Sequence, residues 1–141
     1  VAGVIAAAGG EPWSGMPAGT TMGHLHLHVG DLELASRFYS QALGLDRMAW
    51  SYPGALFLAA GGYHHHLGTN IWAGAGARAP EPDQAQLLEW TLEVPEEAAM
   101  QQARASLREG GFDAEPLANA LRTRDPWGTV LRLVVASRRA E

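Results

Sequence analysis

The sequence predicts one α+β domain that contains two tandem βαβββ units. A strand, a helix and three further strands can be traced over residues 22–72, and the same order starts again over residues 87–136. Equivalent positions in the two units are offset by about 65 residues, so that Val29 corresponds to Val94. A repeat at a nearly constant offset indicates that one supersecondary unit occurs twice.

Residues 22–141 form the predicted domain, and residues 73–86 link its two units. Residues 1–21 are predicted to be an extended lead-in, because Gly, Pro, Ser and Thr crowd the stretch GEPWSGMPAGTTM. A chain of 141 residues is long enough for one domain with a core of its own.

The first unit opens with HLHLHV at 24–29, whose alternation predicts a strand with one apolar face. Asp31 can then cap a helix in which apolar residues recur at helical spacing, and Gly44 ends that helix. Turn residues separate the three strands that follow, which are expected at 48–52, at 55–59 and from 63 to about 72.

The second unit repeats this order. LEWTLEV at 88–94 predicts its first strand, Pro95 and Glu96 open a helix, and the Gly-Gly pair at 110–111 ends it. Short strands are expected around 115–122, and the turn DPWG leads into a last strand, TVLRLVV.

Composition and charge exclude several classes of function. The net charge of −5 opposes general binding to nucleic acid or to an anionic membrane, and the apolar opening stretch is too short to span a bilayer. Without cysteine the chain has no disulfides and no thiolate ligands, so a metal would be bound by nitrogen and oxygen. The sequence has no P-loop, dinucleotide fingerprint or serine hydrolase elbow. The cytoplasm is the expected location.

All six histidines lie in two short stretches, HLHLHV and YHHH. The leucines of the first strand must pack under the helix. The three histidines of HLHLHV, at 24, 26 and 28, are therefore expected on the opposite face. A shift of one residue in the last strand of the first unit would place His65 inward instead of His66. The repeat assigns four equivalent inward positions, namely His24, His66, Glu89 and Arg132.

These features resemble the vicinal oxygen chelate superfamily, which includes glyoxalases, bleomycin-resistance proteins and extradiol dioxygenases. The resemblance rests on GHLHLHVGDLELASRFYSQALGLD at 23–46, on the repeated unit and on the DPWG turn. A closer resemblance, through EPWSGMPAGT, MGHLHLHVGDL and GGYHHHLGTNIWAG, is to the C-terminal half of two-half bacterial proteins of the catechol-2,3-dioxygenase-like kind. It covers nearly the whole chain and implies a stand-alone half or a half that pairs with another copy.

The resemblance implies a cupped, barrel-like mixed sheet with helices on its convex side and a divalent metal on the inward residues. Extradiol and fosfomycin-resistance relatives carry histidine at the position of Glu89 and glutamate at that of Arg132. The usual site is therefore altered, because an always protonated guanidinium cannot bind a metal. The rearranged metal set implied here is His24, His66 and Glu89, which suits Fe²⁺, Mn²⁺ or Zn²⁺.

Such a set implies an enzyme of the dioxygenase, isomerase or cyclase type that acts on an oxygen-chelating small molecule, such as a catechol, an enediol, a dicarbonyl or a polyketide-like compound. Arg132 would stabilise the enolate or phenolate that forms, and His64, His26 or His28 would transfer the proton. The alternative is a metal-free protein that sequesters an aromatic small molecule, in which Glu89 and Arg132 form an ion pair. The outer strand edges and the habit of the family imply a homodimer, or pairing with a second glyoxalase-like half.

Overall fold

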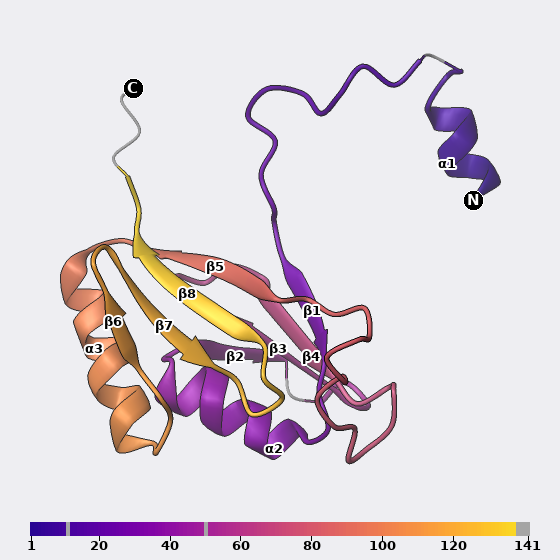
Figure 1. Cartoon of the computed structure of the whole chain (residues 1–141). Coiled ribbons are helices and arrows are strands. Elements are labelled where there is room, and N and C mark those ends of the chain that lie inside the picture. The colour runs from indigo at the N-terminus through magenta and orange to yellow at the C-terminus, as the bar shows by residue number, and fades with distance from the viewer. Residues whose placement is uncertain (11, 50, 138–141) are drawn as a thin grey trace.

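The computed structural model describes residues 1–10, 12–49 and 51–137, whose strands form two four-stranded mixed sheets (Figure 1). The first sheet has the strand order β1-β4-β3-β2, in which β1 and β4 run parallel and the other neighbours antiparallel. Its strands are β1 Leu25–His28, β2 Asp46–Ala49, β3 Ala55–Ala59 and β4 Leu67–Asn70.

The second sheet has the same topology, with the strand order β5-β8-β7-β6 and one parallel pair, β5 with β8. Its strands are β5 Glu89–Val94, β6 Glu115–Leu117, β7 Ala120–Arg124 and β8 Val130–Val135. The matching topologies confirm the predicted α+β fold and its repeated βαβββ unit. The two sheets are separate, and the described strands form no closed barrel.

The helix of the first unit begins and ends where the sequence indicates. α2 spans Leu32–Ala35 and continues directly into the π-helical segment η1, Ser36–Ala42. The Asp31 carboxylate caps α2 by accepting a hydrogen bond from the Leu34 N–H at 2.7 Å. Gly44 follows η1 with φ of 93°, a left-handed conformation that favours glycine and stops the helix.

The two units share one hydrophobic core, in which η1 packs beside α3, Glu97–Glu109. The ring of Tyr39 on η1 lies 6.5 Å from the ring of Trp90 on β5. The ring of Phe38 lies 4.9 Å from that of Phe112, which follows α3. Buried residues of both sheets belong to the same cluster, so hydrophobic burial holds the two units against each other through their helices.

Alternation along the strands decides which faces point away from this core. In β1, Leu27 is buried, whereas His26 and His28 are exposed. In β5, Trp90 packs against the core, whereas Glu89 is exposed. Each sheet therefore turns its apolar face to the shared core and its polar face outward.

A buried hydrogen bond also joins the units. The Tyr39 hydroxyl donates to Asp125 Oδ2 at 2.6 Å, and the backbone N–H groups of Trp127 and Thr129 donate to Oδ1 at 2.9 Å. Burial raises the pKa of the Asp125 carboxyl, while these hydrogen bonds oppose the rise. Burial first, and then the charge of Asp125, raises the pKa of the Tyr39 phenol well above its usual value. The DPWG turn is thus anchored on η1.

The strands around the histidines differ from the prediction in their bounds. β2 ends at Ala49 rather than reaching residue 52, and Trp50 of the expected strand lies outside the described residues. β4 begins only at Leu67, because the chain leaves the Gly61–Gly62 turn through bends at His64 and His66.

The lead-in also differs, because it starts with a short helix, α1, at Ala2–Ala7. Alanine has the highest helix propensity, and the left-handed residues Gly9 and Gly10 end this helix. α1 lies apart from the two sheets, and the chain that follows runs toward them and joins them at β1 (Figure 1). Among the described residues, no helix is long and apolar enough to cross a membrane.

Candidate metal centre

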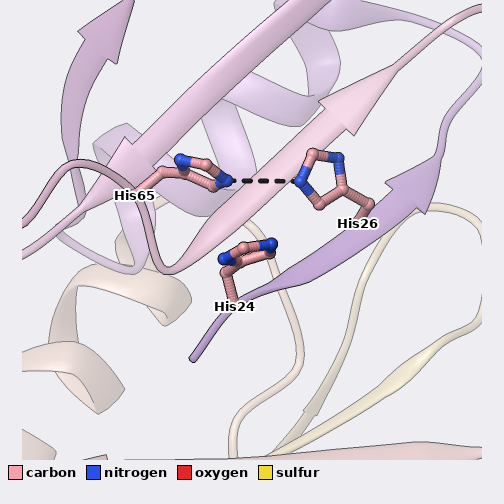
Figure 2. Close-up of side chains that lie close together, drawn as sticks. All are labelled: His24, His26 and His65. Atoms are coloured by element: carbon pink, nitrogen blue, oxygen red, sulfur yellow. Dashed lines mark hydrogen bonds between the residues drawn. The ribbon is translucent and has the colours of Figure 1, made fainter. Parts of the chain in front are cut away.

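Three histidines of the first unit converge on the outward face of the first sheet (Figure 2). Each of His24, His26 and His65 offers one ring nitrogen, and these three atoms lie within 4.8 Å of one another. His26 Nε2 and His65 Nε2 are 3.2 Å apart and form a hydrogen bond, for which one of the two rings must carry the proton. We call these three residues the histidine triad.

The period of the β-strand places two members of the triad. His24 directly precedes β1 and His26 lies two residues further on, so both side chains leave the same face. On the neighbouring strand Gly68 is the register partner of His26. A Cβ atom at Gly68 would lie 2.7 Å from the His26 ring, so the absence of a side chain there gives that ring its space.

His65 reaches the triad from the segment before β4. Burial lowers the pKa of the His65 imidazole, and the charges of neighbouring histidines, His24 first, lower it further. The neutral form, which this shift favours, is the form that binds a metal. The ring centres of His24 and His65 lie 4.6 Å apart, so protonation of both would place two positive charges side by side.

Aromatic rings continue from the triad across the same face. Phe57 on β3, the register partner of Gly68, lies 5.0 Å from the ring of His65 and 5.9 Å from that of His26. The half-exposed Tyr52 lies 5.7 Å beyond Phe57. The sequence prediction did not include Phe57, although its central place in ALFLA, opposite Gly68, could have indicated it.

The predicted site residues are not all brought together. His64 lies beside the triad, with its ring 6.0 Å from that of His24 and 4.6 Å from that of His65. His66 is outside the group, and its Nδ1 accepts a hydrogen bond from the Ala60 N–H at 3.2 Å. Within the described part of the chain, the group of side chains close enough to bind a metal includes neither His66 nor Glu89.

Glu89 and Arg132 lie on the outward face of the second sheet. Their closest side-chain atoms, Arg132 Nη1 and Glu89 Oε1, are 3.4 Å apart, and the two side chains are 41% and 40% exposed. The expected ion pair is therefore present, but at the surface. The buried Nε of Arg132 has no hydrogen-bond partner among the described residues.

Three neutral imidazoles can bind Zn²⁺, Fe²⁺ or related metals and leave further coordination positions open. His24 belongs both to the predicted ligand set and to the observed triad. The open positions would face solvent, where a small molecule can approach. The donor set therefore fits a divalent metal with open coordination positions.

The comparisons with known proteins agree with the fold. No family model matches the chain. Catechol-2,3-dioxygenase of Bacillus subtilis (strain 168) is 40% identical to it over 129 residues, which cover 89% of the chain and 45% of that protein. The chain therefore spans about half the length of this relative.

Solved structures show the same fold at lower identity. The fosfomycin resistance protein FosX of Mesorhizobium loti aligns with a TM-score of 0.59 at 14% identity, covering 87% of this chain and 96% of its own. Lactoylglutathione lyase of Agrobacterium tumefaciens aligns with a TM-score of 0.60 at 18% identity, covering 86% and 96%. A glyoxylase/bleomycin resistance protein/dioxygenase domain from Frankia sp. EAN1pec aligns with a TM-score of 0.62 at 19% identity, covering 84% and 98%.

Two mixed sheets, each formed by a βαβββ unit, define the glyoxalase-like fold. The chain has the glyoxalase-like fold of these structures, and its similarity to a catechol-2,3-dioxygenase supports the resemblance to the vicinal oxygen chelate superfamily.

Proposed function

We propose that this protein is a metal-dependent enzyme that acts on a small molecule able to chelate the metal through two oxygens, such as a catechol, an enediol or a dicarbonyl. The observation that carries the proposal is the histidine triad, whose three ring nitrogens gather on an open face of the sheet. The similarity to a catechol-2,3-dioxygenase supports the same class of chemistry. Fe²⁺, Mn²⁺ and Zn²⁺ are the metals that the donor set favours.

The residues around the triad would have separate roles in this reaction. The triad would hold the metal, which supplies Lewis-acid activation of the bound oxygens. His64 lies beside His24 and His65 but outside the triad, so its imidazole is free to accept or return a substrate proton. Phe57 and Tyr52 would form an apolar wall for the carbon skeleton of the substrate.

A second molecule would complete this site. Among the described strands, β1 pairs with one neighbour only and so has a free edge. Arg132 pairs with Glu89 on the second sheet and is not part of the triad. Another copy, or another glyoxalase-like half, would supply it to the triad, where it would stabilise a developing oxyanion. We therefore propose a homodimer or a two-half protein as the working form.

The ion pair between Glu89 and Arg132 favours one alternative. In that alternative the protein binds and sequesters an aromatic small molecule without a metal, and the aromatic rings next to the triad are its contact surface.

The deciding experiment is the metal content per chain of tag-free protein, purified anaerobically and measured by plasma mass spectrometry. His24→Ala and His65→Ala are expected to abolish metal binding while circular dichroism stays unchanged, and the matched control His66→Ala is expected to keep the metal. Loss of metal in His66→Ala but not in His65→Ala would instead establish the set of His24, His66 and Glu89. Failure of the wild-type protein to take up any of the three metals would leave the sequestration alternative.

If metal binds, the reaction type follows from activity with catechols. Oxygen consumption that requires both the metal and His64 would identify a ring-cleaving dioxygenase. Conversion of an enediol without oxygen consumption would identify an isomerase.

A further inference from the structure

A second concave site lies between the two units, apart from the histidine triad. It is a cleft of about 820 Å³ bordered by the end of η1, by α3, by β5 and by the turn before β4. This volume is in the range of pockets that bind small molecules. None of the three triad histidines lines it.

The floor of the cleft is apolar and reaches the shared core. Leu133, Ala103 and Leu43 line it, and all three are buried. A ligand that fills this floor would bury apolar surface of its own, which stabilises binding by about 25 cal/mol per Å².

His66 supplies a fixed hydrogen-bond donor on one wall. A backbone N–H can donate only to an unprotonated ring nitrogen, and the Ala60 N–H donates to His66 Nδ1 at 3.2 Å. In the neutral imidazole the proton therefore resides on Nε2. His66 thus lines the cleft with a donor that a carbonyl or hydroxyl oxygen can accept from.

The free edge of β5 supplies further polar groups. The backbone carbonyls of Leu88 and Val94 accept hydrogen bonds from the β8 side of β5. The even-numbered residues of this stretch therefore direct their backbone groups toward β8. Because alternate residues of a strand direct their backbone groups to opposite edges, the N–H and C=O groups of Thr91 and Glu93 point to the free edge. Both residues line the cleft.

The charge of the lining selects against anions. Glu93 is the one acidic side chain among the described residues that line the cleft. A carboxylate ligand would be repelled by Glu93, and no arginine borders the cleft to attract it.

We propose that this cleft is a second binding site, for a neutral small molecule with an apolar body and a carbonyl or hydroxyl oxygen. The apolar body lies on the floor, and the oxygen accepts from His66 and from the free edge of β5. The run of three histidines thereby serves two sites, with His65 in the triad and His66 in the cleft.

The test uses the neutral fluorescent probe N-phenyl-1-naphthylamine with the full chain, at a pH near 8. Its fluorescence is expected to rise on binding, and 2-decanone is expected to displace it at lower concentration than decanoate. His66→Asn keeps an acceptor for the Ala60 N–H but removes the distal donor. It is expected to raise the dissociation constant of 2-decanone about 2- to 10-fold, as the loss of one hydrogen bond does.

Two variants locate the probe. Ala99→Phe, at a half-buried position of the cleft wall, is expected to weaken probe binding at least about tenfold by filling the space. Gln102→Trp fills the cleft from its exposed rim and is expected to weaken probe binding as well. It replaces Ala99→Phe if that variant folds poorly. His28→Asn, an exposed change on β1, is the matched control and is expected to leave binding unchanged.

Absence of a fluorescence rise would overturn the proposal, as would binding that neither cleft-filling variant weakens. Equal displacement by decanoate and 2-decanone would overturn the assignment to neutral ligands.

Discussion

The link between Tyr39 and Asp125 offers the sharpest test of how the two units hold together. Tyr39 is 0% exposed and Asp125 5% exposed, and their hydrogen bond spans 86 positions of the sequence. Tyr39→Phe removes only the hydroxyl group and leaves the packing of the ring in place. The Asp125 carboxylate then loses a donor inside the protein, which costs about 1.5–3 kcal/mol for a hydrogen bond to a charged group.

We expect the free energy of unfolding to fall by about 2 kcal/mol near pH 8. In a chain of this size that corresponds to a fall in Tm of about 4–8 °C. Urea denaturation followed by circular dichroism measures the first quantity, and a thermal melt measures the second.

The effect should depend on pH in a defined direction. The folded-state pKa of Asp125 is raised above its unfolded value of 3.8, so protonation of this group favours the folded state. The stabilisation of the folded state by protonated Asp125 is complete below pH 3.8 and is lost as the pH rises through the folded-state pKa. Removal of the Tyr39 donor raises that pKa further, so the difference between variant and wild type should be largest near pH 8 and should shrink toward about pH 4.

Tyr52→Phe is the matched control, because it makes the same chemical change at a residue that is 54% exposed. It should change the free energy of unfolding by less than about 0.5 kcal/mol. The assigned role of the hydrogen bond between Tyr39 and Asp125 would be refuted if Tyr39→Phe lowered the free energy of unfolding no more than the control does. A decrease that stays constant with pH would refute it too.

Two further predictions concern the triad and the surface ion pair. Gly68→Ala places a Cβ atom 2.7 Å from the His26 ring, so the ring must move, and metal affinity measured by titration should fall at least about tenfold while the protein stays folded. An unchanged affinity would show that His26 is not needed for the metal. Glu89→Gln breaks a pair whose side chains are 40% and 41% exposed, so urea denaturation should show a change below about 1 kcal/mol. A loss well above that value would mean that the pair is buried in the working assembly.

The sequence by itself was sufficient for the repeat and for the apolar face of the first strand in each unit. HLHLHV and LEWTLEV alternate with period two, and the structure places Leu27 in the core, as predicted, whereas Glu89, predicted at an inward position, is exposed. Local chemistry also determined the helix ends, since an Asp31 cap and a glycine with positive φ act within a few residues of the chain.

Other features needed the tertiary structure. Strict alternation predicts His66 beside His24, but β4 starts at Leu67, and the irregular segment before it brings His65 to the triad instead. The outward direction of both polar faces depends on the packing of η1 against α3 in one shared core. A strand pattern determines which residues share a face, but only the packing of distant elements determines what that face meets, because the contacts that decide it join residues far apart in the chain.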